Sequence, residues 1–272
     1  VVVTDAMDMR AIRQGEALRE EALRAAKAGA DLLLVTSDPQ DQARVFEGLL
    51  HGVQAGQLSM NELQASVERI TRLKQWLSDN SAIHDLSVIR SAEHMKIADE
   101  IAERSITLLR DQNHYLPIKL DADQRIAVVV PVPEDLTPAD TSSYIQPKLA
   151  ESIRVYHSKT DEFTIPYSPG DQEVAAILDR VRGYDLIMAG TINACAEEHQ
   201  AVFVRELLKA GKSVILLAMR LPYDGGLFPQ ASTILCTYSI LEPSMKAVAK
   251  ALFGFGEAKG QLPVSVPGLK EA

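Results

Sequence analysis

The chain has 272 residues, 46% hydrophobic and 24% charged, which is an ordinary composition for a globular protein of about one or two domains. Its 28 Lys and Arg against 37 Asp and Glu give a net charge of −9. Nucleic-acid binding is therefore not expected, because it needs a basic face. No apolar run approaches the roughly 20 residues that span a bilayer, so no membrane-spanning segment is expected.

The chain begins with two predicted strands joined by a helix. Val1–Thr4 is a β-branched run without polar alternation, which predicts a fully buried strand. A helix over 16–28 and a second buried strand over 30–35 follow, and this arrangement is typical of a parallel βαβ unit. A further helix is expected over about 39–51.

A long amphipathic helix comes next. Ser59 and Glu62 form a capping box, which predicts that a helix begins there. Trp76 is expected to pack near its end. The polar segment 79–91 is predicted to be a linker, and a helix is expected over 92–105. The apolar stripe of the capped helix is Leu63, Val67, Ile70, Leu73 and Leu77.

The remaining residues predict a second α/β region, a mostly parallel sheet with helices on both faces. Its expected strands are 125–131, 184–190, 213–218 and 232–238, and its expected helices are 171–182, 197–210 and 243–253.

The N-terminal part cannot close by itself, because two buried parallel strands leave both sheet edges unpaired. We interpret it as the last quarter of a (β/α)8 barrel that begins upstream of residue 1. The fold class is thus α/β, a partial TIM barrel followed by an α/β/α sandwich. The expected domains are 1–78 (barrel), 79–104 (linker and connecting helix) and 105–272 (sandwich).

The first strand carries the main candidate for chemistry. Asp5 follows it, at the rim where barrel enzymes bind substrates, and its carboxylate suits a nucleophile or a stabiliser of positive charge. The alternative is that Asp5 only caps a turn. Asp8 and Arg10 are expected to form a solvated pair. Met7 and Met9 can line a pocket, although packing is the commoner role.

The two cysteines, Cys195 and Cys236, have neither CxxC nor CxxH spacing. This argues against a zinc or redox site and predicts two buried thiols that act as small apolar residues.

Three segments of the first part stand out: VVVTDAMDMRAI, AGADLLLV and SVERITRLK. Three more lie in the second part: AERSITLLRD, LPYD and GQLPVSVPG. The first three resemble the end of the catalytic barrel of glycoside hydrolase family 3, above all its bacterial β-N-acetylglucosaminidase branch. The other three resemble the C-terminal sandwich domain of that family. The resemblance covers nearly the whole chain.

The resemblance implies retaining hydrolysis of a terminal β-linked N-acetylglucosamine, with Asp5 as the nucleophile and Met9 as a substrate contact. The partner is then a small carbohydrate, an oligosaccharide or a muropeptide of peptidoglycan recycling. No metal or organic cofactor is implied.

That branch takes its acid/base from a His–Asp pair near a KH-x-PGHG motif, which this sequence does not contain. We therefore expect the chain by itself to be inactive. The resemblance favours an extracytoplasmic location, and the oligomeric state stays open. The alternative function is a non-catalytic module, receiver-like or carbohydrate-binding. No motif assigns the histidines, which are His51, His84, His94, His114, His157 and His199.

Overall fold

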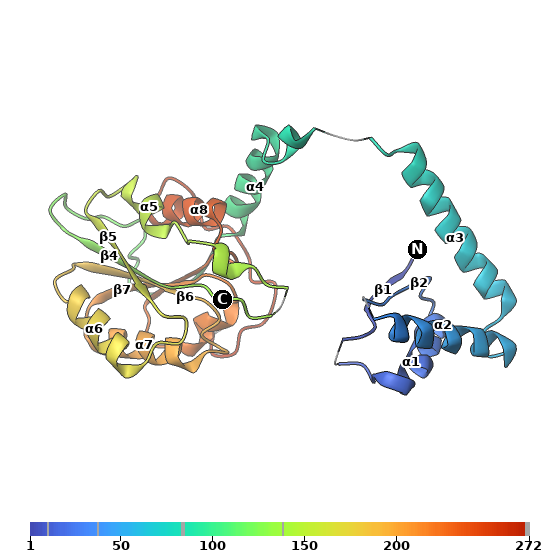
Figure 1. The fold of residues 1–272 in the computed structure, drawn as a ribbon. Coiled ribbons are helices and arrows are strands. Elements are labelled where there is room, and N and C mark those ends of the chain that lie inside the picture. Colours follow the sequence, from blue (N-terminus) through green and yellow to red (C-terminus); the bar gives the residue numbers. More distant parts are fainter. Residues whose placement is uncertain (10, 37, 83–84, 138, 270–272) are drawn as a thin grey trace. The chain divides into compact units, whose positions relative to one another are not determined.

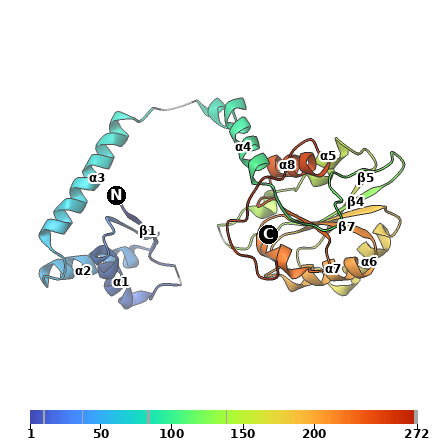
Figure 2. The ribbon, with the colours of Figure 1, turned by 180° about the vertical axis from the view of Figure 1, so that it is seen from behind.

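The computed structural model describes residues 1–9, 11–36, 38–82, 85–137 and 139–269. They form two compact units, Val1–Leu86 and Ser87–Ala272, called the first and the second unit below. Figures 1 and 2 show the ribbon of each unit from opposite sides. The division into 1–78, 79–104 and 105–272 stays a prediction, since compactness alone does not mark domain boundaries.

The first unit contains the expected βαβ arrangement. Two strands pair in parallel, and two helices pack together over one face of this small sheet. A short 3₁₀ helix over Gly15–Ala17 precedes the first helix. The elements are β1 (Val3–Ala6), α1 (Leu18–Lys27), β2 (Leu32–Leu34), α2 (Pro39–Gln54) and α3 (Met60–Asp79).

The expectation that both strands are fully buried is wrong for this chain. Val1, Val2 and Val3 are 45%, 58% and 47% exposed, and Leu34 in β2 is 50% exposed. The reason is that β1 and β2 pair only with each other among the described residues, so both outer edges are open. The small core consists of Met7, Leu18, Ala22 and Val45.

Helix α3 begins as predicted, because the Ser59 hydroxyl accepts the Glu62 N–H at 3.1 Å. Its first half is tied to Asp31, a side chain only 1% exposed, which accepts hydrogen bonds from Ser66 and Arg69 at 2.6 Å. The Arg69 guanidinium lowers the pKa of Asp31.

The second half of α3 extends beyond α1 and α2 (Figure 1), and its apolar stripe does not pack as expected. Leu73 and Leu77 are 37% and 53% exposed, and Trp76, expected to be a packing residue, is 59% exposed. In the described part of the first unit, no element covers this stripe.

The second unit is built on one six-stranded sheet of order β3-β8-β7-β6-β4-β5. All neighbours are parallel except β3 and β8, which are antiparallel. The mostly parallel α/β sheet is thus confirmed. Its strands are β3 (Thr107–Asp111), β4 (Ile126–Pro131), β5 (Thr160–Ile165), β6 (Leu186–Thr191), β7 (Ser213–Ala218) and β8 (Thr233–Cys236).

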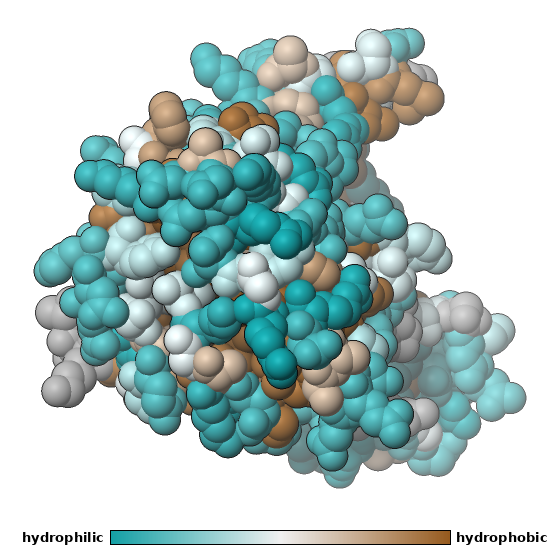
Figure 3. All heavy atoms as spheres, turned by 90° about the vertical axis from the view of Figure 1, so that its left-hand side faces the viewer, coloured by the Kyte–Doolittle hydropathy of each residue, from teal (hydrophilic) through white to brown (hydrophobic). Residues whose placement is uncertain are grey.

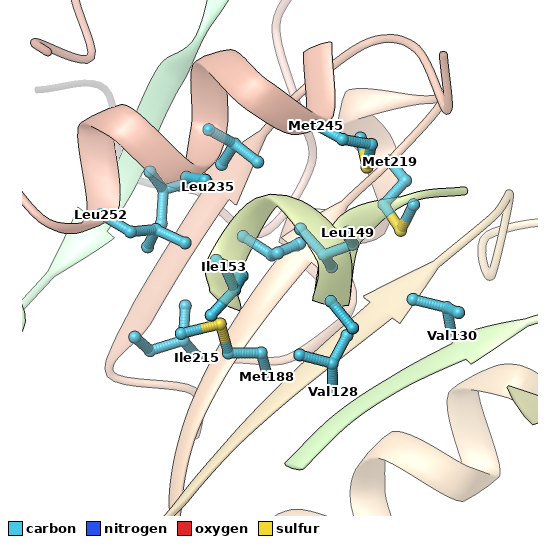
Figure 4. Close-up of a cluster of buried hydrophobic side chains, with 14 of the residues drawn as sticks. Val128, Val130, Leu149, Ile153, Met188, Ile215, Met219, Leu235, Met245 and Leu252 are labelled. Carbon is cyan, nitrogen blue, oxygen red and sulfur yellow. The ribbon is translucent and has the colours of Figure 1, made fainter. Parts of the chain in front are cut away.

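Helices cover both faces of this sheet, as predicted (Figures 1 and 2). One core cluster packs α4, α5 and α8 on the sheet, and the other packs α6 and α7 on the opposite face. Figure 4 shows the first cluster, in which Leu149 and Ile153 of α5 point toward Met188 and Ile215 of the strands. The helices are α4 (Ala92–Ser105), α5 (Leu149–Arg154), α6 (Asp171–Val181), α7 (Glu198–Lys209) and α8 (Glu242–Leu252).

Three elements of the second unit were not predicted: β3, α5 and β5. The edge strand β5 exposes half of its residues, and its sequence, Thr-Asp-Glu-Phe-Thr-Ile, lacks a continuous apolar run. Helix α5 spans only six residues, too few to show helical periodicity. Strand β3 follows α4 after one residue, without a turn signal. Shorter 3₁₀ segments lie at Leu86–Val88, Ser142–Tyr144 and Pro222–Leu227.

The face of the second unit that Figure 3 shows is mainly hydrophilic. Figure 3 shows small, separate hydrophobic patches on the face of this unit that is turned to the viewer. In the described ranges, no helix has the length and apolar character needed to cross a bilayer.

Candidate active site

Asp5 lies in an irregular stretch of β1. Val3 pairs with Leu32 and Ala6 with Leu34, so the step from Val3 to Ala6 spans one residue more on β1 than on β2. The Thr4 hydroxyl accepts the Leu34 N–H at 3.0 Å within this stretch. Such bulges change the direction of a side chain and are frequent beside active sites.

The Asp5 side chain is exposed, and its Oδ1 accepts the N–H of Ala6 at 2.7 Å. It lies near the carboxyl end of a parallel strand, the edge at which barrel enzymes place reacting groups. A carboxylate in this position is accessible to a ligand and can act as a nucleophile.

The two methionines that follow Asp5 differ in burial. Met7 is 4% exposed and packs with Leu18 and Val45, so its role in this chain is packing. Met9 is 43% exposed, so its side chain is open to contact. The role of Met9 toward a substrate stays a prediction.

Asp8 is held by the loop after the neighbouring strand rather than left free in solvent. Its Oδ2 accepts the Thr36 N–H at 3.2 Å and the Thr36 hydroxyl. The bond from the hydroxyl is the main reason why the pKa of Asp8 is lowered. Arg10, its expected partner, lies outside the described residues. The contact with Thr36 joins the loop that follows β1 to the loop that follows β2.

The described histidines form no group with Asp5 within the first unit. In the described part of the first unit, His51 is the one histidine, and it lies in the last turn of α2, at the opposite end of the βα unit from Asp5. His84 lies outside the described residues. In the described ranges, no three His, Cys, Asp or Glu side chains are arranged to hold a metal ion.

A polar cluster in the second unit was missed from the sequence. Asp224 is fully buried and accepts the Thr191 hydroxyl at 2.7 Å and the Cys195 N–H at 2.9 Å. Asn193, 5% exposed with φ of 59°, has a buried Oδ1 that accepts no hydrogen bond from the described residues. These bonds tie the loop after β6 to the 3₁₀ segment after β7, which indicates a structural role for Asp224.

Ser168, Glu197 and His199 make a second cluster that resembles a triad in composition only. His199 Nδ1 lies 3.1 Å from the Ser168 hydroxyl and 2.7 Å from Glu197 Oε1. A triad uses both ring nitrogens, one toward the nucleophile and one toward the carboxylate. Here both neighbours share one nitrogen, so the cluster is a hydrogen-bonded contact between the loop after β5 and the start of α7.

Aromatic rings stack on the second unit. Tyr156 stacks on Phe253 and Phe255, with centroids 5.4 and 5.0 Å apart. Phe255 is 74% exposed. An exposed ring that is held by stacking can contact the apolar face of a sugar.

The expectation of two buried thiols is only half right. Cys236 is buried, whereas Cys195 is exposed, because it lies in the loop after β6 rather than in a strand. Burial raises the pKa of Cys236 to about 12. Partial burial of the thiol, with the nearby Asp224 carboxylate, raises the pKa of Cys195 to about 11.

We expect both thiols of the folded chain to react slowly with a disulfide reagent at pH 7.5. Because only the thiolate attacks, the raised pKa of Cys195 lowers its rate by about 10²-fold relative to a free cysteine. The rate should rise with pH, and both thiols should react fast in guanidinium. Absorbance of the released thiolate measures this. A fast thiol in the folded chain that disappears in Cys195→Ser would contradict it.

Comparison with known proteins finds similarity to glycosidases. Residues 1–73 match the sequence model of the glycosyl hydrolase family 3 N-terminal domain. The chain is 24% identical over 300 residues to β-hexosaminidase A of Pseudoalteromonas piscicida, covering 98% of this chain and 50% of the relative. It is 23% identical over 318 residues to lysosomal β-glucosidase of Dictyostelium discoideum, covering 98% and 38%. The chain spans half or less of the length of these relatives.

The chain is also similar to a solved structure of a glycosidase. A glycoside hydrolase family 3 β-N-acetylglucosaminidase from Paenibacillus sp. str. FPU-7 is 28% identical and similar in structure, with a TM-score of 0.82. The match covers 99% of this chain and 52% of the solved chain.

Proposed function

We propose that this chain, which belongs to glycoside hydrolase family 3, supplies the nucleophile Asp5 to a retaining enzyme that removes terminal β-linked N-acetylglucosamine. A relative named β-hexosaminidase A and a similar solved structure named as a β-N-acetylglucosaminidase support this substrate class. The natural substrate would be a carbohydrate with such an end, a muropeptide among them.

The proposed reaction has two steps. An Asp5 oxygen attacks the anomeric carbon, the bond to the leaving oxygen breaks, and an acid outside the residues described above gives that oxygen a proton. This leaves a glycosyl ester on Asp5. Water, deprotonated by the same group, then attacks the anomeric carbon and frees the carboxylate, so that two inversions give retention.

The observation that carries the proposal is the setting of Asp5: an exposed carboxylate, on an irregular stretch of a parallel strand, within the residues that match the family. Asp5 can act as a nucleophile or as a stabiliser of the oxocarbenium-like transition state. Both roles need an exposed carboxylate in this position. Met9, exposed in the loop that follows, is the proposed substrate contact.

We further propose that the acid/base comes from outside this chain. The chain spans half of its hexosaminidase relative, and His51 lies at the far end of the βα unit from Asp5. Without a positioned proton donor, the rate should fall by about 10²–10⁴-fold, so the chain alone should turn over little substrate.

The test compares two nitrophenyl glycosides. We expect the natural protein that contains this chain to release nitrophenol from the β-N-acetylglucosaminide with the higher kcat/KM, and from the β-glucoside with a lower one. A hydrogen-bonding site rejects an analogue that lacks its polar group by a factor of up to about 10⁴. The 272-residue chain should release almost none, and robust release by it would contradict the external acid/base.

A preference for the β-glucoside would instead favour the activity named for the Dictyostelium relative. Binding of N-acetylglucosamine oligomers by the natural protein without hydrolysis of either glycoside would favour a carbohydrate-binding module. The stacked Tyr156 and exposed Phe255 are the observation that supports that second role.

A further inference from the structure

We propose that Gln14 is a positioning residue for the proposed glycosidase, because its side chain sets the conformation of the loop that follows Asp5. This inference rests on the proposed function. Gln14 Nε2 donates to three backbone carbonyl oxygens of that loop: Met9 at 2.8 Å, Ile12 at 2.7 Å and Met7 at 3.3 Å. An amide nitrogen has two hydrogens, so the three acceptors share them and converge on one atom.

The side chain of Gln14 is free for this task because it does not cap the helix. Gln14 is the N-cap of the 3₁₀ helix Gly15–Ala17, a position whose side chain often accepts a backbone N–H. Here its backbone is extended, with φ of −104°, and its side chain makes no cap hydrogen bond. It is turned back to the loop instead.

Other hydrogen bonds also hold this loop. Gln14 therefore adds its bonds to a loop that already has a defined conformation. The Met7 N–H donates to the Leu34 carbonyl at 2.8 Å, and Asp8 accepts a hydrogen bond from Thr36 in the loop after β2. The Met9 N–H donates to the Ala6 carbonyl at 3.3 Å, which turns the chain back toward the residue next to Asp5.

Gln14 therefore acts through the loop and not on the substrate. The two loop anchors at Met7 and Asp8 lie toward its start, whereas Gln14 also holds its second part, at Met9 and Ile12. Without these bonds, Met9 keeps among the described residues its backbone hydrogen bonds to Ala6 and Ile12, which leave the turn beside Asp5 more freedom to move. A displacement of about 1 Å in positioning groups can cost on the order of 10²-fold in rate.

The test replaces Gln14 by an isosteric residue with the opposite hydrogen-bonding character. In Gln14→Glu, a carboxylate faces three carbonyl oxygens and can donate to none of them at neutral pH. We expect kcat/KM of the natural protein for nitrophenyl β-N-acetylglucosaminide to fall by about 10–10²-fold at pH 7. Protonation of the new carboxyl restores one donor, so the ratio to wild type should recover as the pH falls toward 5.

Gln57→Glu is the matched control, since it makes the same charge change at an exposed glutamine of the same unit. Gln14→Leu keeps most of the side-chain volume without a donor, and it should lose activity with no recovery at low pH. Equal pH profiles for Gln14→Glu and Gln57→Glu would overturn the inference.

A second measurement does not depend on turnover. In Gln14→Leu, the amides of Met9 and Ile12 should exchange hydrogen faster than in wild type, while those of α1 keep their rates. Unchanged exchange in a folded variant would refute the role of Gln14, even if the wild type hydrolyses the substrate. Wild type without hydrolysis would refute the proposed function, and the exchange result would still decide the role of Gln14.

Discussion

Replacing Asp5 by alanine in the natural protein that contains this chain is expected to lower kcat for nitrophenyl β-N-acetylglucosaminide by about 10⁴-fold or more. The loss is large because the first bond to the anomeric carbon cannot form without the carboxylate. Fold and stability should change little, since the Asp5 side chain is exposed and its one hydrogen bond among the described residues is to the adjacent N–H. Initial rates of nitrophenol release measure the effect.

Two further readouts separate a nucleophile from a structural aspartate. A fluorinated glycoside should trap a covalent adduct on the peptide with Asp5 in wild type and form none in Asp5→Ala. Azide should restore turnover in Asp5→Ala and give a glycosyl azide of inverted configuration, because it enters the space that the carboxylate leaves. Asp79→Ala, at the exposed end of α3, is the control. An undiminished adduct in Asp5→Ala would exclude Asp5 as the nucleophile.

Hydrogen exchange of this chain should differ sharply between the two units. We expect the backbone amides of β4, β6 and β7 to exchange at least about 10³-fold more slowly than those of β1 and β2. Every residue of β4 and β6 is buried, and both faces of the sheet carry a core cluster. The strands β1 and β2 cover only the four-residue cluster of Met7, Leu18, Ala22 and Val45.

A factor of 10³ corresponds to about 4 kcal/mol between the opening free energies, which is less than the roughly 5–15 kcal/mol total stability of a domain. Mass spectrometry of peptides that cover each strand, corrected for intrinsic rates, measures it. The same peptides in urea should show no difference. Equal protection in both units would mean that the first unit is as stable as the second, against the exposure of its valines.

The fold of the second unit was largely predictable, because its central strands are evident from the sequence. The segments that became β4, β6 and β7 are continuous apolar runs, which only a sheet covered on both faces can bury. The edge strand β5 and the short α5 escaped prediction because their patterns are partly polar or too short. Their positions follow from pairing and packing with elements far along the chain.

The candidate site was also predictable only in part. Asp5 stands out in the sequence, because an acidic residue follows an apolar strand. Gln14, by contrast, is one of many polar residues around a glycine, and its role depends on a side chain that turns back to three carbonyl groups. The burial of Asp224 depends likewise on Thr191 and Cys195, more than 25 residues away.

By itself, the sequence determined the class of the fold, the direction of the central strands and the carboxylate at the end of the first strand. These are local properties, since apolar runs, caps and turn residues act over a few neighbours. Only the tertiary structure decided which side chains are buried and which hydrogen bonds they make. The valines of β1 and the apolar stripe of α3 are exposed, and the Gln14 side chain is bonded to the loop after Asp5. Burial and side-chain hydrogen bonds depend on which distant segments meet, and periodicity does not carry that information.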